Sequence, residues 1–69
     1  MKHIIKGNTE FFWYDNDSFV NGAPADVIVI DGMEYSLFIE CPAGGMYTDS
    51  LNNEYCIDIN GDFIDDYPW

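Results

Sequence analysis

The fold is decided by the stretch between residues 27 and 35, which reads Val27-Ile28-Val29-Ile30-Asp31-Gly32-Met33-Glu34-Tyr35. Four β-branched residues are followed by Asp-Gly, which tolerates the positive φ angles of a type I′ turn. The pattern predicts an antiparallel hairpin with a two-residue loop, and that loop fixes the register. We expect the core face to carry Ile28, Ile30, Met33 and Tyr35. We expect the opposite face to carry Glu34, Ser36, Phe38 and Glu40.

Two similar turn signals occur at Gly7-Asn8 and at Asn60-Gly61. Each lies between short runs rich in Ile, Tyr, Phe or Trp, which are typical of strands. The connecting residues 15–25 and 41–53 are rich in Asn, Asp, Gly, Pro and Ser, and we expect loops there with at most one helical turn around residues 17–20. The sequence therefore predicts an all-β fold, with six short antiparallel strands in three hairpins forming a small barrel or sandwich. Residues 1–69 are expected to form a single domain.

The third hairpin predicts a second polar face. A two-residue loop at Asn60-Gly61 would place Asp58 opposite Phe63 and Ile57 opposite Ile64. The face turned away from the core would then carry Glu54, Asp58, Phe63, Asp65 and Tyr67.

Composition excludes several classes of protein. The 69 residues include 13 acids, two lysines and one histidine, and the formal net charge is −11. Phosphate contacts need Lys and Arg, so direct binding to nucleic acid or to an anionic membrane is excluded. Because 48% of the residues are hydrophobic and 17% aromatic, the chain is not a disordered acidic tail. A chain this short buries only about 60% of its unfolded surface, which leaves little room for a substrate pocket.

The sequence offers no catalytic or metal-binding motif of the usual kinds. His3 is the only histidine, and no nucleophile–histidine arrangement or phosphate loop is present. We therefore expect no enzymatic activity and no cofactor. Asp58-Ile59-Asn60-Gly61-Asp62 resembles the start of a calcium loop, but Phe63 occupies the position that requires glycine. A hairpin turn explains the same residues, so we expect no metal ligand, although a calcium-dependent module stays open.

Location and cysteine chemistry follow from the amino-terminal residues. Only two apolar residues, Ile4 and Ile5, lie between the basic start and Lys6, whereas a signal peptide needs an apolar run of about 7–15 residues. We expect residence in the cytoplasm, that of the host cell if a phage encodes the protein. Reduced thiols are then expected at Cys41 and Cys56, and a disulfide between them stays an alternative.

The charge itself predicts a partner. A net charge of −11 exceeds the roughly 2–8 charges that serve solubility in a small domain, which favours a partner of opposite sign. Aromatic side chains beside the carboxylates would add contact area that salt does not screen. The residues expected to contact the partner are Glu34, Phe38, Glu40, Glu54, Asp58, Asp62, Phe63, Asp65, Asp66 and Tyr67.

In size, charge and acidic-aromatic hairpin faces, the chain resembles the DNA-mimic inhibitors of phages and mobile elements. These include anti-restriction proteins, uracil-glycosylase inhibitors and anti-CRISPR proteins. The resemblance involves no shared motif. It implies a non-enzymatic, anti-CRISPR-like inhibitor that occupies the cationic DNA or RNA channel of a host defence or repair complex.

Two other interpretations stay open. The first is a small acidic interaction module, such as an immunity or antitoxin-like partner or an assembly subunit, which binds through exposed aromatics. Weak salt dependence of binding would favour this module, whereas steep salt dependence would favour the mimic. The second is a domain whose acidity serves solubility alone. In each case the sequence leaves open whether the protein is a monomer or a homodimer.

Overall fold

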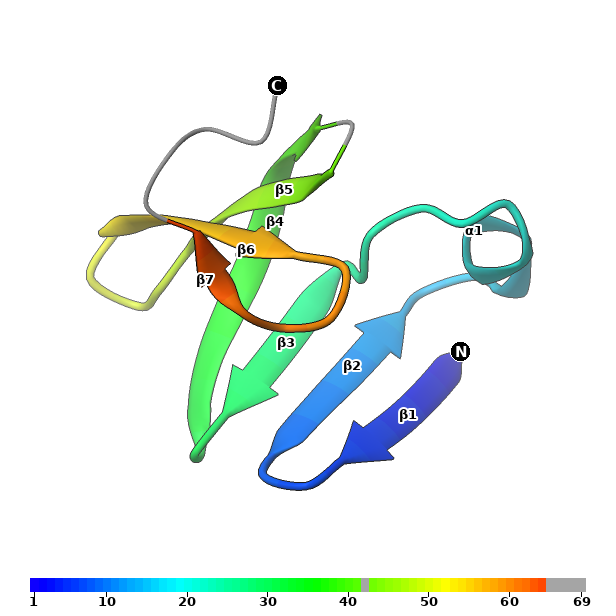
Figure 1. The fold of residues 1–69 in the computed structure, drawn as a ribbon, viewed down its shortest axis with the longest axis horizontal. Helices are drawn as coiled ribbons and strands as arrows, with labels where there is room; N and C mark the ends of the chain where they lie inside the picture. The colour runs from blue at the N-terminus through cyan, green and yellow to red at the C-terminus, as the bar shows by residue number, and fades with distance from the viewer. Residues whose placement is uncertain (42, 65–69) are drawn as a thin grey trace.

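The chain folds into one antiparallel sheet in which each strand pairs with its neighbours in sequence (Figure 1). A computed structural model describes residues 1–41 and 43–64. The sheet has seven strands in the order β1 to β7, and one short helix joins β2 to β3. The elements are β1 (Lys2–Lys6), β2 (Thr9–Trp13), α1 (Asn16–Val20), β3 (Val27–Ile30), β4 (Met33–Cys41), β5 (Gly44–Thr48), β6 (Glu54–Asp58) and β7 (Phe63–Ile64).

The long strand β4 belongs to two halves of this sheet. Its first part, Met33–Ser36, pairs with β3, and its second part, Ser36–Cys41, pairs with β5. The sheet bends along β4, so that the half made of β5, β6 and β7 turns back over the half made of β1, β2 and β3 (Figure 1). The β6–β7 loop reaches the far half, since a Cβ atom added to Gly61 would lie 2.8 Å from the ring of Phe11.

The core lies on the inner face of this bend. It combines side chains from both halves of the sheet, and Phe19 of α1 packs against it. Tyr47 of β5 is fully buried, and its hydroxyl donates a hydrogen bond of 2.7 Å to the carbonyl oxygen of Ala25. The buried cluster consists of Phe11, Trp13, Ala25, Ile28, Tyr35, Tyr47 and Ile57.

The hairpin predicted at Asp31-Gly32 is confirmed. Ile30 pairs with Met33 and Ile28 with Tyr35, and both loop residues have positive φ, 51° at Asp31 and 81° at Gly32. The all-β class is also confirmed, and α1 lies where one helical turn was expected, with the Asp15 carboxylate accepting a hydrogen bond from the Ser18 amide.

The six-strand count and the barrel are not confirmed, because residues 44–48 form a further strand and the seven-stranded sheet is not closed into a barrel. Over the described residues, β1 and β7 are the two edges of the sheet. The missed strand β5 begins with two glycines, which are usually unfavourable in strands. Here they are needed: a Cβ at Gly44 would collide with the Ile57 carbonyl, and one at Gly45 with the Leu37 side chain.

The register predicted for the third hairpin is also wrong. Ile57 pairs with Phe63 and Cys56 with Ile64, one residue away from the prediction. Strand β6 ends at Asp58, whose carboxylate accepts hydrogen bonds from the amides of Asn60 and Asp62, both at 2.9 Å. This capping forms a wider loop and turns Phe63 to the inner face.

A bulge in β4 corrects a third expectation. Leu37 pairs with Tyr47 but Ile39 pairs with Met46, so Phe38 is the extra residue. Because a one-residue insertion reverses the alternation of side chains, Glu40 faces the same side as Tyr47 and not that of Glu34. The negative charge of Glu40 is one cause of the raised Tyr47 pKa, after burial and the charge of Asp26.

Removing the Tyr47 hydroxyl tests the link between the two halves. In Tyr47→Phe the buried carbonyl of Ala25 loses its donor, and we expect a loss of about 1–2 kcal/mol of unfolding free energy. For a domain of this size that lowers the melting temperature by roughly 5–15 °C in a calorimetric scan. Tyr14→Phe is the matched control, because Tyr14 is 64% exposed, and an equal loss in both variants would contradict the role of Tyr47.

Candidate interaction surface

The face of the sheet that points away from the core is the candidate surface, and we call it the outer face. Cross-strand pairing places its residues in rows, because directly opposed residues project to the same side. One row runs from Ile5 through Glu10 and Val29 to Glu34. The next row consists of His3, Phe12, Val27, Ser36, Thr48 and Glu54.

Three glutamates on alternate strands cross the outer face. Glu10 lies on β2, Glu34 on β4 and Glu54 on β6. Because neighbouring strands are ~4.8 Å apart, Glu10 and Glu34, which share a row on strands separated by β3, are ~10 Å apart across the sheet. Glu10 and Glu34 share one row, and Glu54 lies in the next row on the other side of the bend, so the outer face carries three separate negative charges.

Both lysines project from the opposite face. Lys2 pairs with Trp13 and Lys6 with Thr9, which are inner-face positions. The Lys2 ammonium lies 4.9 Å from the centre of the Phe19 ring, and that of Lys6 lies 5.6 Å from the centre of the Phe11 ring. The two lysines therefore lie on the opposite face of the sheet from Glu10, Glu34 and Glu54.

His3 is the one basic side chain on the outer face. Its ring stacks on Phe12, with centroids 4.2 Å apart and planes at 10°, and its Nε2 lies 3.0 Å from Oε1 of Glu10. Among the described residues this is the single ion pair that the geometry allows, and it forms only when His3 is protonated.

Several other acids have structural roles within the described part of the chain. The Asp26 carboxylate accepts from the Tyr14 amide, and that of Asp31 accepts from the Asn8 side chain. Asp15 caps α1 and Asp58 caps the β6–β7 loop. A part of the high acidic content therefore serves as hydrogen-bond acceptors at turns and caps.

Asp49 is the most heavily used of these turn acids. It accepts hydrogen bonds from the amides of Leu51 and Asn53, the Asn53 side chain and the Tyr55 hydroxyl, at 2.8–3.2 Å. Desolvation alone would raise the pKa of Asp49, but the hydrogen bonds outweigh it and lower that pKa. The hydrogen bond to Asp49, followed by desolvation, raises the pKa of the Tyr55 hydroxyl. The ionised carboxylate of Asp49 therefore stabilises the β5–β6 turn.

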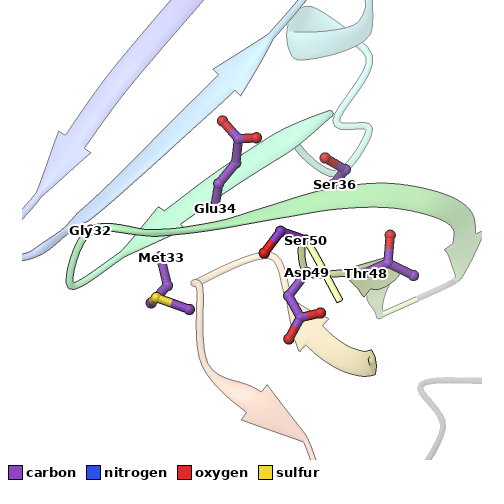
Figure 2. A pocket seen from close by; sticks show the side chains of 7 residues that line it. All are labelled: Gly32, Met33, Glu34, Ser36, Thr48, Asp49 and Ser50. Atoms are coloured by element: carbon purple, nitrogen blue, oxygen red, sulfur yellow. The ribbon is translucent and has the colours of Figure 1, made fainter. Parts of the chain in front are cut away.

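Two shallow hollows border Glu34. The apolar hollow, of about 270 Å³, lies on the outer face and is lined by Met1, Phe12, Tyr14, Val27, Val29 and Glu34. The polar hollow, of about 250 Å³, is lined by Gly32, Met33, Glu34, Ser36, Thr48, Asp49 and Ser50. Figure 2 shows Glu34, Ser36 and Thr48 projecting to one side of the sheet at the polar hollow, and Met33 and Asp49 projecting to the other. Both volumes fall below the roughly 300–1,000 Å³ of ordinary ligand pockets.

The residues predicted to contact a partner fall into several groups. Glu34 and Glu54 both project from the outer face, in neighbouring rows on β4 and β6, and Asp62 is exposed in the β6–β7 loop. Glu40 and Phe63 lie on the inner side, where Phe63 packs edge-to-face on Tyr35 and Tyr55. Phe38 is the bulge residue and is 46% exposed. Asp58 is the capping residue described above, and Asp65, Asp66 and Tyr67 lie outside the described residues.

Sequence reasoning missed Glu10 and the aromatic part of the outer face. The sequence feature that could have located them is the alternation of side chains in residues 9–14, which places Phe11 and Trp13 on one face and Phe12 and Tyr14 on the other. Without the register of β2 against β3, that alternation did not show which pair is buried.

The two cysteines are free thiols on strands that β5 separates. Partial burial, and then the neighbouring Cys56, raise the pKa of the Cys41 thiol. Within residues 1–41 and 43–64, no three His, Cys, Asp or Glu side chains are grouped to hold a metal ion. In the same part of the chain, no helix has the length and apolar character needed to cross a bilayer.

We compared the chain with protein-family models, with curated proteins and with solved structures, and none of them matches. The geometry of the outer face and the charge of the chain are therefore the evidence that bears on its function.

The role of Asp49 gives a pH-dependent prediction. Because folding lowers its pKa below the ordinary 3.8, the charged form stabilises the fold above that pH, and the contribution disappears as pH falls through the folded pKa. We expect Asp49→Asn to lower the melting temperature at pH 7 and to match the parent protein at the lowest pH where both still fold. Asp62→Asn, which leaves the turn intact, is the control. A destabilisation by Asp49→Asn that persists unchanged in acid would contradict the assignment.

Proposed function

We propose that this protein is a non-enzymatic inhibitor that occupies the basic nucleic-acid-binding groove of a larger protein and presents its outer face in place of phosphates. The observation that carries the proposal is the separation of charge: Glu10, Glu34 and Glu54 cross the outer face while both lysines project from the other side. Three of the 13 acids therefore lie on the face from which neither lysine projects, and these three would meet the groove directly.

The spacing of the glutamates fits a row of basic side chains. Phosphates of one DNA strand are ~3.4 Å apart along the helix axis, so carboxylates ~10 Å apart correspond to about every third phosphate. The molecule measures 27 × 27 × 20 Å, which covers about eight base pairs of duplex length. Lysines and arginines that bind a phosphate backbone would pair with Glu10, Glu34 and Glu54, and long-range attraction would speed association at low salt.

Apolar contact would supply the part of the affinity that salt does not screen. The apolar hollow lies on the same face and is bordered by Glu34. Phe12 and Tyr14 offer rings there, and aromatic side chains are frequent anchors of protein interfaces. The small volume of both hollows supports a surface for protein contact over a site for chemistry.

The apolar hollow also supports a second candidate function, a small interaction module that binds through exposed aromatics. In that case Tyr14→Ala would weaken binding at every salt concentration, whereas loss of the outer-face glutamates would change it little. The mimic predicts the reverse order of effects and a steep dependence on salt.

The decisive experiment compares two variants of equal charge. Glu10→Gln/Glu34→Gln/Glu54→Gln and Asp17→Asn/Glu40→Gln/Asp62→Asn each remove three of the 11 net charges and leave −8. The immobilised parent protein is expected to retain nucleic-acid-binding proteins from a bacterial lysate at low salt and to release them when duplex DNA is added. The outer-face variant should bind them about tenfold or more weakly, since each exposed pair contributes up to about 1 kcal/mol.

The second variant should bind nearly as well as the parent protein. Equal weakening in the two variants would show that net charge, and not the outer face, carries the binding. Retained proteins that duplex DNA does not displace would favour the aromatic interaction module. Circular dichroism of each variant confirms that the sheet is intact, and Glu10→Gln alone reports on the His3 contact.

A further inference from the structure

Strand β4 has a stretch of free edge in the middle of the sheet, next to the polar hollow. It pairs with β3 over Met33–Ser36, but its pairing with β5 begins only at Ser36. Residues 33–35 therefore have a strand on one side only. The far wall of the hollow is formed by Thr48, Asp49 and Ser50, where β5 ends and the β5–β6 turn begins (Figure 2).

The hydrogen-bond phase of β4 shows where the main chain of Glu34 points. The amide of Leu37 donates to the carbonyl of Asp26 on the β3 side, at 2.9 Å. In an antiparallel pair, residues bond to a given neighbour at every second position. Leu37, Tyr35 and Met33 therefore bond toward β3, and Glu34 and Ser36 bond toward the other side. Ser36 meets Thr48 there, but Glu34 has no strand residue opposite it on that side.

We propose that the polar hollow receives a short extended segment of the partner protein, which pairs with the main-chain N–H and C=O of Glu34 and carries a basic residue at that position. The segment adds one rung to the sheet, the mode called β-augmentation. The hollow has the volume of about eight water molecules at ~30 Å³ each. That is enough for one or two residues of extended chain.

The charge of the occupant follows from the side chains beside it. A residue paired with Glu34 projects to the same face as the Glu34 carboxylate, which is exposed and has no hydrogen-bond partner among the described residues. A basic side chain is therefore favoured at that position and an acidic one is disfavoured. A second copy of this chain, with net charge −11, is a poorer occupant for the same reason.

This inference rests on the proposed function for the nature of the partner, but a small probe tests it separately. The probe is the blocked tripeptide Val-Arg-Val, titrated into the ¹⁵N-labelled protein and followed by NMR. The matched probe carries an N-methyl group on the arginine amide, which keeps the charge and removes a main-chain donor. We expect saturable shifts around the polar hollow, slower hydrogen exchange at the Glu34 amide, and binding about two- to tenfold weaker for the methylated peptide.

A pair of tryptophan variants locates the site. Ser50 lines the hollow, whereas the adjacent Leu51 is 79% exposed and does not line it. Ser50→Trp should weaken the tripeptide about tenfold or more by filling the space, and Leu51→Trp should leave its affinity unchanged.

Unchanged exchange at Glu34, equal affinity for both peptides, or equal effects of the two tryptophans would overturn the inference. So would a dimer in sedimentation analysis that protects the Glu34 amide without peptide, because a second copy would then be the occupant. If the peptide fails while duplex DNA still displaces the retained proteins, only this inference is wrong. If DNA does not displace them but the peptide binds as described, the mimicry is wrong and the strand-pairing site stands.

Discussion

The whole arrangement depends on the contact that holds the bent sheet closed on its inner face. Tyr47 is fully buried between the halves, and its hydroxyl bonds to the carbonyl that precedes Asp26. Burial, together with the negative charges of Asp26 and Glu40, raises the Tyr47 pKa well above the usual value for tyrosine. The neutral phenol therefore persists at physiological pH. Because this closure removes the side chains of Phe11, Trp13, Tyr35 and Tyr47 from solvent, a chain with a net charge of −11 overcomes its own repulsion.

Bending also decides which polar groups face outward. With Phe11, Trp13 and Tyr35 on the inner face, the two lysines lie over Phe19 and Phe11 at the margin of the core. They also occupy β1, an exposed edge strand, and lysines on such edges discourage pairing with other chains. The same constraint leaves the alternate positions of β2, β4 and β6 for glutamates. Packing of the core and segregation of charge are thus two consequences of one register.

The sequence predicted local features well and their combination less well. The Asp31-Gly32 loop was predicted correctly, because the positive φ angles that this turn requires depend only on the two loop residues themselves. Strand β5 was missed because the requirement for Gly44 and Gly45 comes from Ile57 and Leu37, which are remote in sequence. The one-residue error at β7 arose from the Asp58 carboxylate, whose two amide contacts outweigh the short turn that Asn60-Gly61 favours. Among the site residues, Glu34 was predicted and Glu10 was not, since only cross-strand pairing places them in one row.

The acids of this chain divide into two kinds: those that accept hydrogen bonds at turns and caps, and those that lie on strands with no such role. Asp15, Asp26, Asp31, Asp49 and Asp58 accept backbone or side-chain donors at caps and turns, and a neutral Asn would fill several of these roles. Glu10, Glu34 and Glu54 have no such duty at a turn, and they lie on strands, where glutamate is disfavoured. Solubility would be served by acids placed anywhere on the surface. Three of the four strand glutamates lie on the outer face and Glu40 on the inner side. Under the proposed function that placement serves the partner, and strand pairing at Glu34 would put the centre of the contact on β4.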